Sequence, residues 1–196
     1  GRISTCETLL RWNHPTRGSV SPADIIPVAE DMGLIVDLGR WILRRACMEC
    51  MKWPEGVSVA VNFSPQQFHQ RDVLSEIRYA LEVSGLPAHR LEIEITESVA
   101  MESAEVVVAN LNMLRSMGVG IAIDDFGTGY SSMSYLKRYP VTSLKIDRSF
   151  VMDLPSNPAD AGIVRAIVEM AHGSRLHVTA EGVETKEQFV RLQECG

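Results

Sequence analysis

The sequence predicts an α/β fold in which mainly parallel strands and helices form a TIM-like (β/α)8 barrel. Short runs rich in β-branched residues alternate with longer helical patterns along the whole chain, which is typical of parallel strands joined by helical crossovers. Each run has one apolar face and one small or polar face; in residues 58–62, Val59 and Val61 share the apolar face. An open sheet covered on both faces would have continuously apolar strands, so the pattern favours a barrel.

The predicted elements alternate from one end of the chain to the other. Strands are expected at residues 4–11, 57–63, 90–96, 119–125, 142–147 and 177–182. Helices are expected at residues 22–32, 36–53, 66–84, 103–117, 131–138, 159–172 and 185–194. Ser21-Pro22 and Ser64-Pro65 are typical helix starts, because serine caps the first turn and proline fits the first helical position. A glycine, which readily adopts the left-handed conformation favoured after a helix, follows four of the helical patterns: Gly33, Gly85, Gly118 and Gly173.

The size and composition indicate one globular domain. The chain has 196 residues, with 45% hydrophobic and 22% charged residues and a net charge of −6, so a basic surface for duplex nucleic acid is not expected. No run of about 18 apolar residues is present, and direct membrane insertion is therefore not expected. A (β/α)8 barrel usually has about 250 residues. We therefore expect residues 1–196 to be a single domain of a longer protein, with N- and C-terminal barrel elements truncated.

Two of the four cysteines, Cys47 and Cys50, have the C-x-x-C spacing of some metal and redox sites. A structural zinc site needs a second pair or nearby histidines, and neither Cys6 nor Cys195 has such a neighbour. The pair lies within the helical pattern at residues 36–53, so packing of this helix is the favoured interpretation and a metal or redox role the alternative. Free thiols are typical of a reducing cytoplasm.

Polar residues, most of them acidic, lie at or near the ends of the predicted strands: Glu7, Asn62, Glu94, Asp124, Asp125, Lys145 and Glu181. The carboxyl ends of barrel strands meet at one rim, where barrel enzymes have their active sites. Two carboxylates about 4 Å apart repel by about 4 kcal/mol at an effective dielectric constant near 20, so such a cluster favours cations. Oxygen ligands select Mg²⁺ or Mn²⁺ over zinc, and paired ions are well suited to phosphodiester hydrolysis. For each acidic residue alone, a solvated strand end is the favoured interpretation. The joint pattern favours the metal site, because the same strand face supplies the polar group each time.

Six motifs follow one another along the chain: Glu7-Thr-Leu-Leu-Arg-Trp-Asn-His-Pro15, Val61-Asn-Phe-Ser64, Glu94-Ile-Thr-Glu97, Asp124-Asp-Phe-Gly-Thr-Gly-Tyr-Ser-Ser132, Lys145-Ile-Asp147 and Glu181-Gly-Val-Glu184. Together they resemble the EAL domains, phosphodiesterases of the bacterial second messenger cyclic di-GMP. The resemblance covers almost the whole chain. It implies a modified TIM-like barrel that hydrolyses one phosphodiester bond of cyclic di-GMP to give linear pGpG, with two Mg²⁺ or Mn²⁺ ions per site. Ca²⁺, which is larger, could occupy the site as an inhibitor.

The resemblance implies a role for each matched position. It assigns six residues as metal ligands: Glu7, Asn62, Glu94, Asp124, Asp125 and Glu181. Asp124 would bridge the two ions. It assigns three residues to catalysis: Lys145, which would orient the attacking water, Glu181, which would assist as general base, and Glu7. Arg11 and Asp147 would contact the substrate. Three residues would anchor the loop after Asp125: Glu97, Gly127 and Gly129.

One position departs from the family, since its Glu-Ala-Leu signature is Glu7-Thr8-Leu9 in this chain. Strand alternation places Thr8 toward the helix layer, so we expect activity to be retained. The family further implies a homodimer, formed through the loop after Asp125 and the helix from Ser131. It implies a cytoplasmic domain of a parent protein that can carry sensor or GGDEF domains and an inner-membrane anchor. The chain ends before the late Gln-Gly segment of the family.

Two other interpretations remain open from the sequence. A catalytically inactive EAL-type domain would act as a cyclic di-GMP receptor or as a protein-interaction module. Such domains lack several ligand positions, whereas this chain has each matched one. An unrelated metal-dependent barrel enzyme would have no affinity for cyclic di-GMP.

Overall fold

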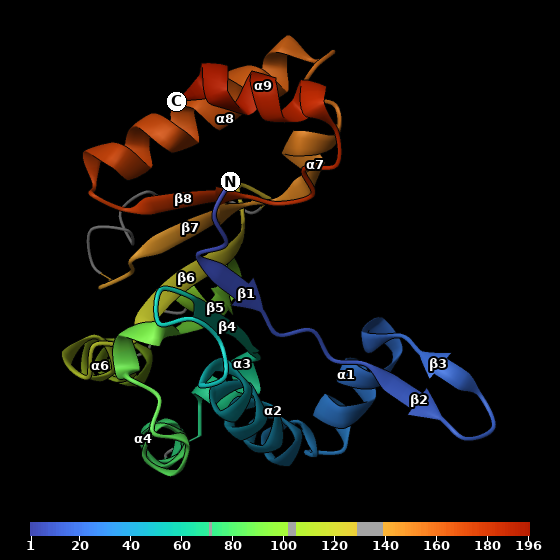
Figure 1. Ribbon diagram of the computed structural model, residues 1–196, viewed down its shortest axis with the longest axis vertical. Coiled ribbons are helices and arrows are strands. Elements are labelled where there is room, and N and C mark those ends of the chain that lie inside the picture. The colour runs from blue at the N-terminus through green and yellow to red at the C-terminus, as the bar shows by residue number, and fades with distance from the viewer. Residues whose placement is uncertain (71, 102–104, 129–138) are drawn as a thin grey trace. The chain divides into compact units, whose positions relative to one another are not determined.

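The computed structural model describes residues 1–70, 72–101, 105–128 and 139–196 (Figure 1). The chain forms two compact units. The first comprises Gly1–Ile93 and Ser116–Val119, and the second comprises Glu94–Arg115 and Gly120–Gly196. The predicted helix at residues 131–138 lies outside the described residues. Among the helices that the structure describes, none has the length and apolar character needed to cross a membrane.

Parallel strands form the sheet of the first unit. β1 (Thr5–Glu7) pairs with β4 (Ser58–Phe63) in a register that aligns Glu7 with Ala60. The predicted strand at residues 4–11 is too long, because regular pairing ends where the N–H group of Thr8 donates to the carbonyl oxygen of Ala60 at 2.9 Å. β5 (Leu91–Thr96) begins in this unit and ends in the second.

The chain after β1 forms a hairpin that the sequence pattern did not predict. β2 (Trp12–His14) and β3 (Gly18–Val20) are antiparallel. The ring of His14 closes the turn, since its Nδ1 atom accepts hydrogen bonds from the N–H groups of Thr16 and Arg17, each at 3.2 Å. Each strand has three residues, too few for an alternating pattern to be recognised.

The helices of the first unit are α1 (Pro22–Asp31), α2 (Ile35–Cys50), α3 (Pro65–Phe68), α4 (Val73–Ser84) and the 3₁₀ helix η1 (Ala88–Arg90). α2 packs on β4 and contacts α1, α3 and α4. The predicted single helix at residues 66–84 is wrong, because the chain forms two helices there. Ser64 and Gln67 form a capping box around the single turn of α3, and Phe68 packs edge-on against Phe63 with ring centroids 6.3 Å apart.

The thiols of Cys47 and Cys50 lie in the core of the first unit, on the buried face of α2. All four cysteines are free. Burial, with a smaller contribution from the neighbouring Cys50, raises the pKa of Cys47 to about 12. A reactive or metal-binding cysteine needs a lowered pKa, so the structure supports the packing interpretation.

Parallel strands also form the sheet of the second unit: β6 (Gly120–Phe126) pairs with β7 (Ser143–Ile146), and β7 pairs with β8 (His177–Ala180). The helices are α5 (Glu97–Met101), α6 (Glu105–Ser116), α7 (Arg148–Met152), α8 (Pro158–Gly173) and α9 (Lys186–Cys195). α8 covers one face of β7 and β8, and α9 packs on α8 (Figure 1). The short helices α5 and α7 were not predicted.

The predicted left-handed glycine after α8 is wrong by two residues. Gly173 is the last residue of α8, and Arg175 adopts the left-handed conformation, with φ of 60°. The N–H group of Leu176 donates to the carbonyl oxygen of Ala171 at 2.9 Å, and that of Arg175 donates to the carbonyl oxygen of His172 at 3.0 Å. These two bonds form a Schellman motif, whose left-handed position falls on Arg175.

Candidate active site

Two consecutive acidic residues, Asp124 and Asp125, lie near the end of β6. Consecutive side chains of a regular strand point to opposite faces. Here the register between β6 and β7 shifts between Ile123 and Phe126, and Asp125 has a left-handed φ of 53°. The N–H group of Asp125 donates to Oδ1 of Asp124 at 3.0 Å. This irregularity brings both carboxylates to one site.

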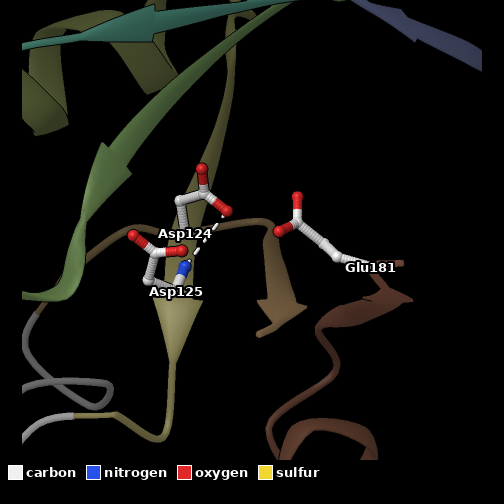
Figure 2. A group of neighbouring side chains, drawn as sticks. All are labelled: Asp124, Asp125 and Glu181. Carbon is white, nitrogen blue, oxygen red and sulfur yellow. Dashed lines mark hydrogen bonds between the residues drawn. The ribbon is translucent and has the colours of Figure 1, made fainter. Parts of the chain in front are cut away.

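Glu181, which directly follows β8, joins these two residues (Figure 2). One carboxylate oxygen of each of the three residues lies within 4.8 Å of the others. The N–H group of Glu181 donates to the carbonyl oxygen of Ile146 at 3.0 Å, which continues the pairing of β7 and β8. Three carboxylate oxygens at this separation form a donor set for a hard cation.

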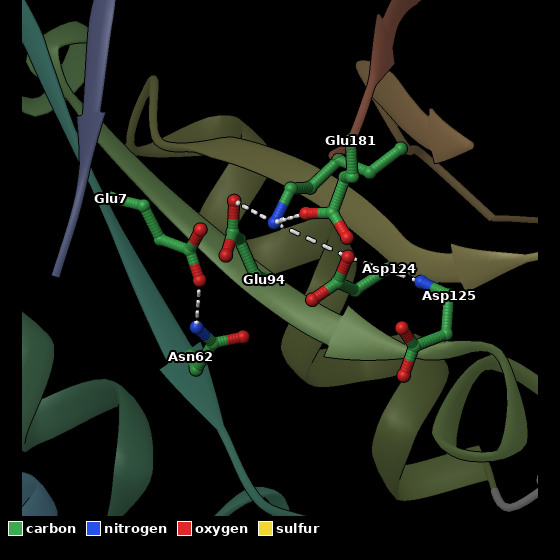
Figure 3. Close-up of polar contacts among 7 residues, drawn as sticks. Glu7, Asn62, Glu94, Asp124, Asp125 and Glu181 are labelled. Atoms are coloured by element: carbon green, nitrogen blue, oxygen red, sulfur yellow. Dashed lines mark hydrogen bonds and ion pairs between the residues drawn. The ribbon is translucent and has the colours of Figure 1, made fainter. Parts of the chain in front are cut away.

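Lys145, on β7, contacts three carboxylates, those of Glu94, Asp124 and Glu181, which Figure 3 labels. Its Nζ atom lies 2.7 Å from Oε1 of Glu181, 2.9 Å from Oε1 of Glu94 and 3.2 Å from Oδ1 of Asp124. Glu94 is nearly inaccessible, with 2% of its side chain exposed. One ammonium group therefore faces three carboxylates, and the negative charge of this cluster exceeds the positive charge.

The electrostatics of the cluster follow from burial and these ion pairs. Burial disfavours the ammonium form of Lys145, but its hydrogen bonds and ion pairs with Glu181, Glu94 and Asp124 outweigh burial and raise its pKa, so Lys145 is charged. Burial also raises the pKa of Asp125, and the neighbouring carboxylates of Asp124 and Asp147 raise it further. The carboxylates at this rim therefore repel one another, and a bound cation would relieve that repulsion.

The side chains of Glu7 and Asn62, in the first unit, form a hydrogen-bonded pair. Nδ2 of Asn62 donates to Oε1 of Glu7 at 2.8 Å, and both residues are exposed. Glu7 is the last residue of β1, and Asn62 is near the end of the neighbouring β4. The predicted ligands thus occur as an amide–carboxylate pair in the first unit and an acidic cluster in the second.

Glu97 contacts the turn after β6. Its Oε2 atom accepts a hydrogen bond from the N–H group of Gly127 at 3.2 Å. Gly127 has φ of 100°, a conformation that favours glycine. Gly129, the other glycine that the sequence assigned to this loop, lies outside the described residues.

Asp147 and Arg11 have local partners in the structure. Asp147 caps α7 by accepting a hydrogen bond from the N–H group of Ser149 at 2.9 Å. Burial opposes the ionised form of Asp147, but its hydrogen bonds, above all from Ser149, lower its pKa. Arg11 is exposed, and its Nη1 atom donates to the carbonyl oxygen of Leu10 at 2.8 Å. The substrate contacts assigned to both residues remain predictions.

Thr8, the departure from the family signature, borders a cleft of about 350 Å³ in the first unit. The residues that line this cleft with it include Trp41 and Ile42 of α2 and Val59 of β4. Thr8 therefore lies beside the helix α2, in a cleft that Glu7 also lines.

The EAL domain sequence profile matches residues 1–196. The chain belongs to the EAL domain family. The predicted family is therefore confirmed. Two residues near the site were not singled out from the sequence. Phe150, on the short helix α7, packs on Gly127, and Gly182, in the turn after β8, packs on Arg148. Neither contact has a signal in the sequence, because each depends on the tertiary structure.

Two relatives of this EAL domain are proteins of Pseudomonas aeruginosa. The cyclic di-GMP phosphodiesterase NbdA is 43% identical over 198 residues, which cover 99% of this chain and 25% of NbdA. The bifunctional diguanylate cyclase/cyclic di-GMP phosphodiesterase MucR is 46% identical over 200 residues, which cover 100% of this chain and 29% of MucR. The EAL domain thus spans about a quarter of the length of these relatives.

Solved structures show the same fold. The PaMucR phosphodiesterase in complex with c-di-GMP has a TM-score of 0.95 at 44% identity, covering 100% of this chain and 81% of that chain. The EAL enzyme Bd1971, in its form with cAMP and cyclic di-GMP bound, has a TM-score of 0.91 at 34% identity, covering 98% of this chain and 54% of that chain. These similarities confirm the predicted fold class, an α/β barrel of the TIM-like type.

Proposed function

We propose that this EAL domain hydrolyses cyclic di-GMP to linear pGpG. The observation that carries the proposal is the gathering of Asp124, Asp125 and Glu181, with oxygens within 4.8 Å of one another, from two strand ends that are distant in sequence. The names of NbdA, MucR and the PaMucR phosphodiesterase support the same substrate.

The donor set fits hard divalent cations. The ligands are carboxylates and one amide, and the single ammonium group of Lys145 leaves the cluster with excess negative charge. We assign one ion to Glu7, Asn62, Glu94 and Asp124, and a second to Asp124, Asp125 and Glu181. Mg²⁺ or Mn²⁺ would supply Lewis-acid stabilisation of the phosphoryl group and an activated water, whereas Ca²⁺ would bind and support little turnover.

Water attacks the phosphorus atom, and the bond from phosphorus to the 3′ oxygen breaks, because the product keeps its phosphate on the 5′ oxygen. The 3′ oxygen leaves and takes up a proton from the solvent to become a hydroxyl group. Glu181 accepts the proton of the water, and the ammonium of Lys145, 2.7 Å from Oε1 of Glu181, orients the water. Glu7 supports the reaction as a ligand of the first metal ion and as a catalytic carboxylate. The exposed guanidinium of Arg11 binds a phosphate of the substrate, and Asp147 contacts the substrate from the start of α7.

The test is a hydrolysis assay that separates cyclic di-GMP from pGpG by chromatography, with Mg²⁺ or Mn²⁺ present. We expect Glu181→Gln to lower kcat by at least about 100-fold, because the variant lacks the proton acceptor. Glu187→Gln changes an exposed residue of α9 and serves as the matched control. Full turnover by Glu181→Gln would contradict the proposal. If the wild type binds cyclic di-GMP tightly without turnover, the domain is a receptor. If the wild type does not bind cyclic di-GMP, the domain is an enzyme with another substrate.

The cellular setting extends this proposal. We expect a cytoplasmic site, since the substrate is an intracellular messenger, and a homodimer formed through the loop after Asp125. That loop and the predicted helix at residues 131–138 include the undescribed residues 129–138. Sensor or GGDEF domains and a membrane anchor in the parent protein remain predictions, which the full-length sequence would test.

A further inference from the structure

The short helix α7 contacts two turns that lie next to the acidic cluster in the sequence, the turn after β6 and the turn after β8. It follows β7 and Asp147 directly. Asp125 lies at the end of β6, two residues before Gly127 in the turn that follows, and the turn after β8 contains Glu181 and Gly182. Both glycines have positive φ angles, 100° for Gly127 and 67° for Gly182.

Phe150 of α7 packs against the turn after β6. A Cβ atom on Gly127 would lie 2.9 Å from Cε2 and 3.3 Å from Cζ of Phe150, so the ring leaves no room for a side chain there. The N–H group of Gly127 is held separately by Glu97. Gly127 is two residues from Asp125, whose left-handed backbone is sparsely populated and depends on its surroundings. The aromatic ring therefore supports the conformation that directs Asp125 into the cluster.

Arg148 of α7 packs against the turn after β8. A Cβ atom on Gly182 would lie 2.8 Å from Cβ and 3.6 Å from Cα of Arg148. Gly182 follows Glu181, whose N–H group is bonded to the last residue of β7. The first turn of α7 therefore limits the position that the Glu181 backbone can take.

α7 is itself held at both ends. Asp147 caps its first turn, and Nε2 of Gln188, on α9, donates to the carbonyl oxygen of Met152 at 3.3 Å. Between these ends the side chain of Val151 is fully buried. Because α7 is fixed at both ends and packed in the core, it can hold both turns in fixed positions.

We propose that α7 is a positioning element that sets the separation of Asp125 and Glu181, with Phe150 as the positioning residue for the turn after β6. The proposal rests on the proposed function, because it concerns the second metal ion. Replacing a residue that holds a metal ligand in place typically lowers the metal affinity by about 10- to 100-fold. The ring of Phe150 packs on Gly127, which is not a predicted ligand, so we infer that its effect passes through the backbone of the turn.

The experiment measures Mn²⁺ binding by titration calorimetry and by the electron paramagnetic resonance signal of free Mn²⁺. We expect Phe150→Ala to weaken the binding of one Mn²⁺ ion by about tenfold and Phe150→Leu, which keeps part of the contact, to weaken it less. Val164→Ala, in the fully buried core of α8, is the control for general destabilisation. It should lower the melting temperature and leave Mn²⁺ affinity unchanged.

Three results would overturn the positioning role: wild-type Mn²⁺ affinity in folded Phe150→Ala, an equal loss in Val164→Ala, or a wild type that binds no Mn²⁺. If Phe150→Ala fails to fold, the Mn²⁺ affinity of Phe150→Leu is compared with those of the wild type and Val164→Ala instead. The proposed function is tested separately by turnover of cyclic di-GMP. A wild type that binds Mn²⁺ without hydrolysis contradicts only the activity, and unchanged Mn²⁺ affinity in the Phe150 variants of an active enzyme contradicts only the positioning role.

Discussion

The N–H group of Asp125 donates a hydrogen bond to the Oδ1 atom of Asp124 at 3.0 Å. This bond accompanies the left-handed conformation of Asp125 and the register shift at the end of β6. Aspartate is among the few residues that adopt this conformation readily. Asp125 therefore makes two contributions: it accommodates the left-handed backbone, and it adds a negative charge to the site.

Asp125→Asn separates these two contributions. Asparagine tolerates the left-handed backbone but lacks the negative charge, so we expect the protein to fold and to bind one Mn²⁺ ion instead of two. Titration calorimetry gives the stoichiometry, with Asp31→Asn on the exposed end of α1 as control. Equal weakening of both ions in Asp125→Asn would contradict the assignment of this residue to the second ion.

Lys145→Met removes the ammonium group from three carboxylates. Loss of one partner from a buried ion pair typically destabilises a protein by 3–5 kcal/mol, so we expect the free energy of unfolding to fall by about 3 kcal/mol in a chelator. Mg²⁺ should restore part of this loss, because the cation replaces the lost charge. Urea denaturation measures both values.

The control for Lys145→Met is Lys52→Met, which removes an exposed lysine paired with Glu49. Such a surface pair contributes about 0.5 kcal/mol, and Mg²⁺ should not change its effect. A Lys145→Met protein with unaltered stability in chelator would show that the carboxylates do not depend on this ammonium group.

Gly182→Ala tests the contact between α7 and the turn after β8. Gly33 has almost the same φ, 68° against 67°, but among the described residues beyond its chain neighbours no atom lies within 4 Å of its Cβ position. Gly33→Ala should therefore show only the backbone strain, about 1 kcal/mol. Gly182→Ala should lower the free energy of unfolding further and weaken Mn²⁺ binding, as calorimetry can measure. Identical stability and metal affinity in the two variants would mean that the contact with Arg148 has no consequence.

Arg90 stabilises the first unit through backbone carbonyl groups. Its buried guanidinium donates to the carbonyl oxygens of Val57 at 2.9 Å, Cys50 at 3.0 Å and Pro54 at 3.1 Å. Arg90→Ala leaves these groups without this donor, and we expect a loss of about 3 kcal/mol in the free energy of unfolding. Arg78→Ala, on the exposed face of α4, should change it by less than about 0.5 kcal/mol. A loss below 1 kcal/mol in Arg90→Ala would contradict this role.

The pKa of Cys47, raised to about 12, predicts slow alkylation. The thiolate is the reactive form, and at pH 9 the folded protein keeps Cys47 protonated. The half-buried Cys6 serves as the comparison site, because the reagent can reach it. Peptide mapping after iodoacetamide treatment measures each site, and urea should make Cys47 reactive. Rapid labelling of Cys47 in the folded protein would favour the redox alternative.

The strand alternation, the acidic strand ends and the order of six motifs predicted the fold class and the family. Strand positions were predicted because period-two patterns are local. The helix at residues 66–84, the glycine cap at Gly173 and the strand end at residue 11 were wrong, since a capping box, a Schellman motif and the end of β pairing fixed those boundaries. The hairpin and α7 are too short for a periodic signal.

The sequence alone determined which residue types stand at the strand ends, and hence that any cluster there would be acidic. Only the tertiary structure decided that Asp125 turns to the side of Asp124, that Lys145 contacts three carboxylates, and that α7 packs on both glycine turns. The physical reason is that side-chain alternation is a local property of an extended backbone. A register shift, a buried ion pair and the packing of an aromatic ring on a glycine depend on segments that are distant along the chain.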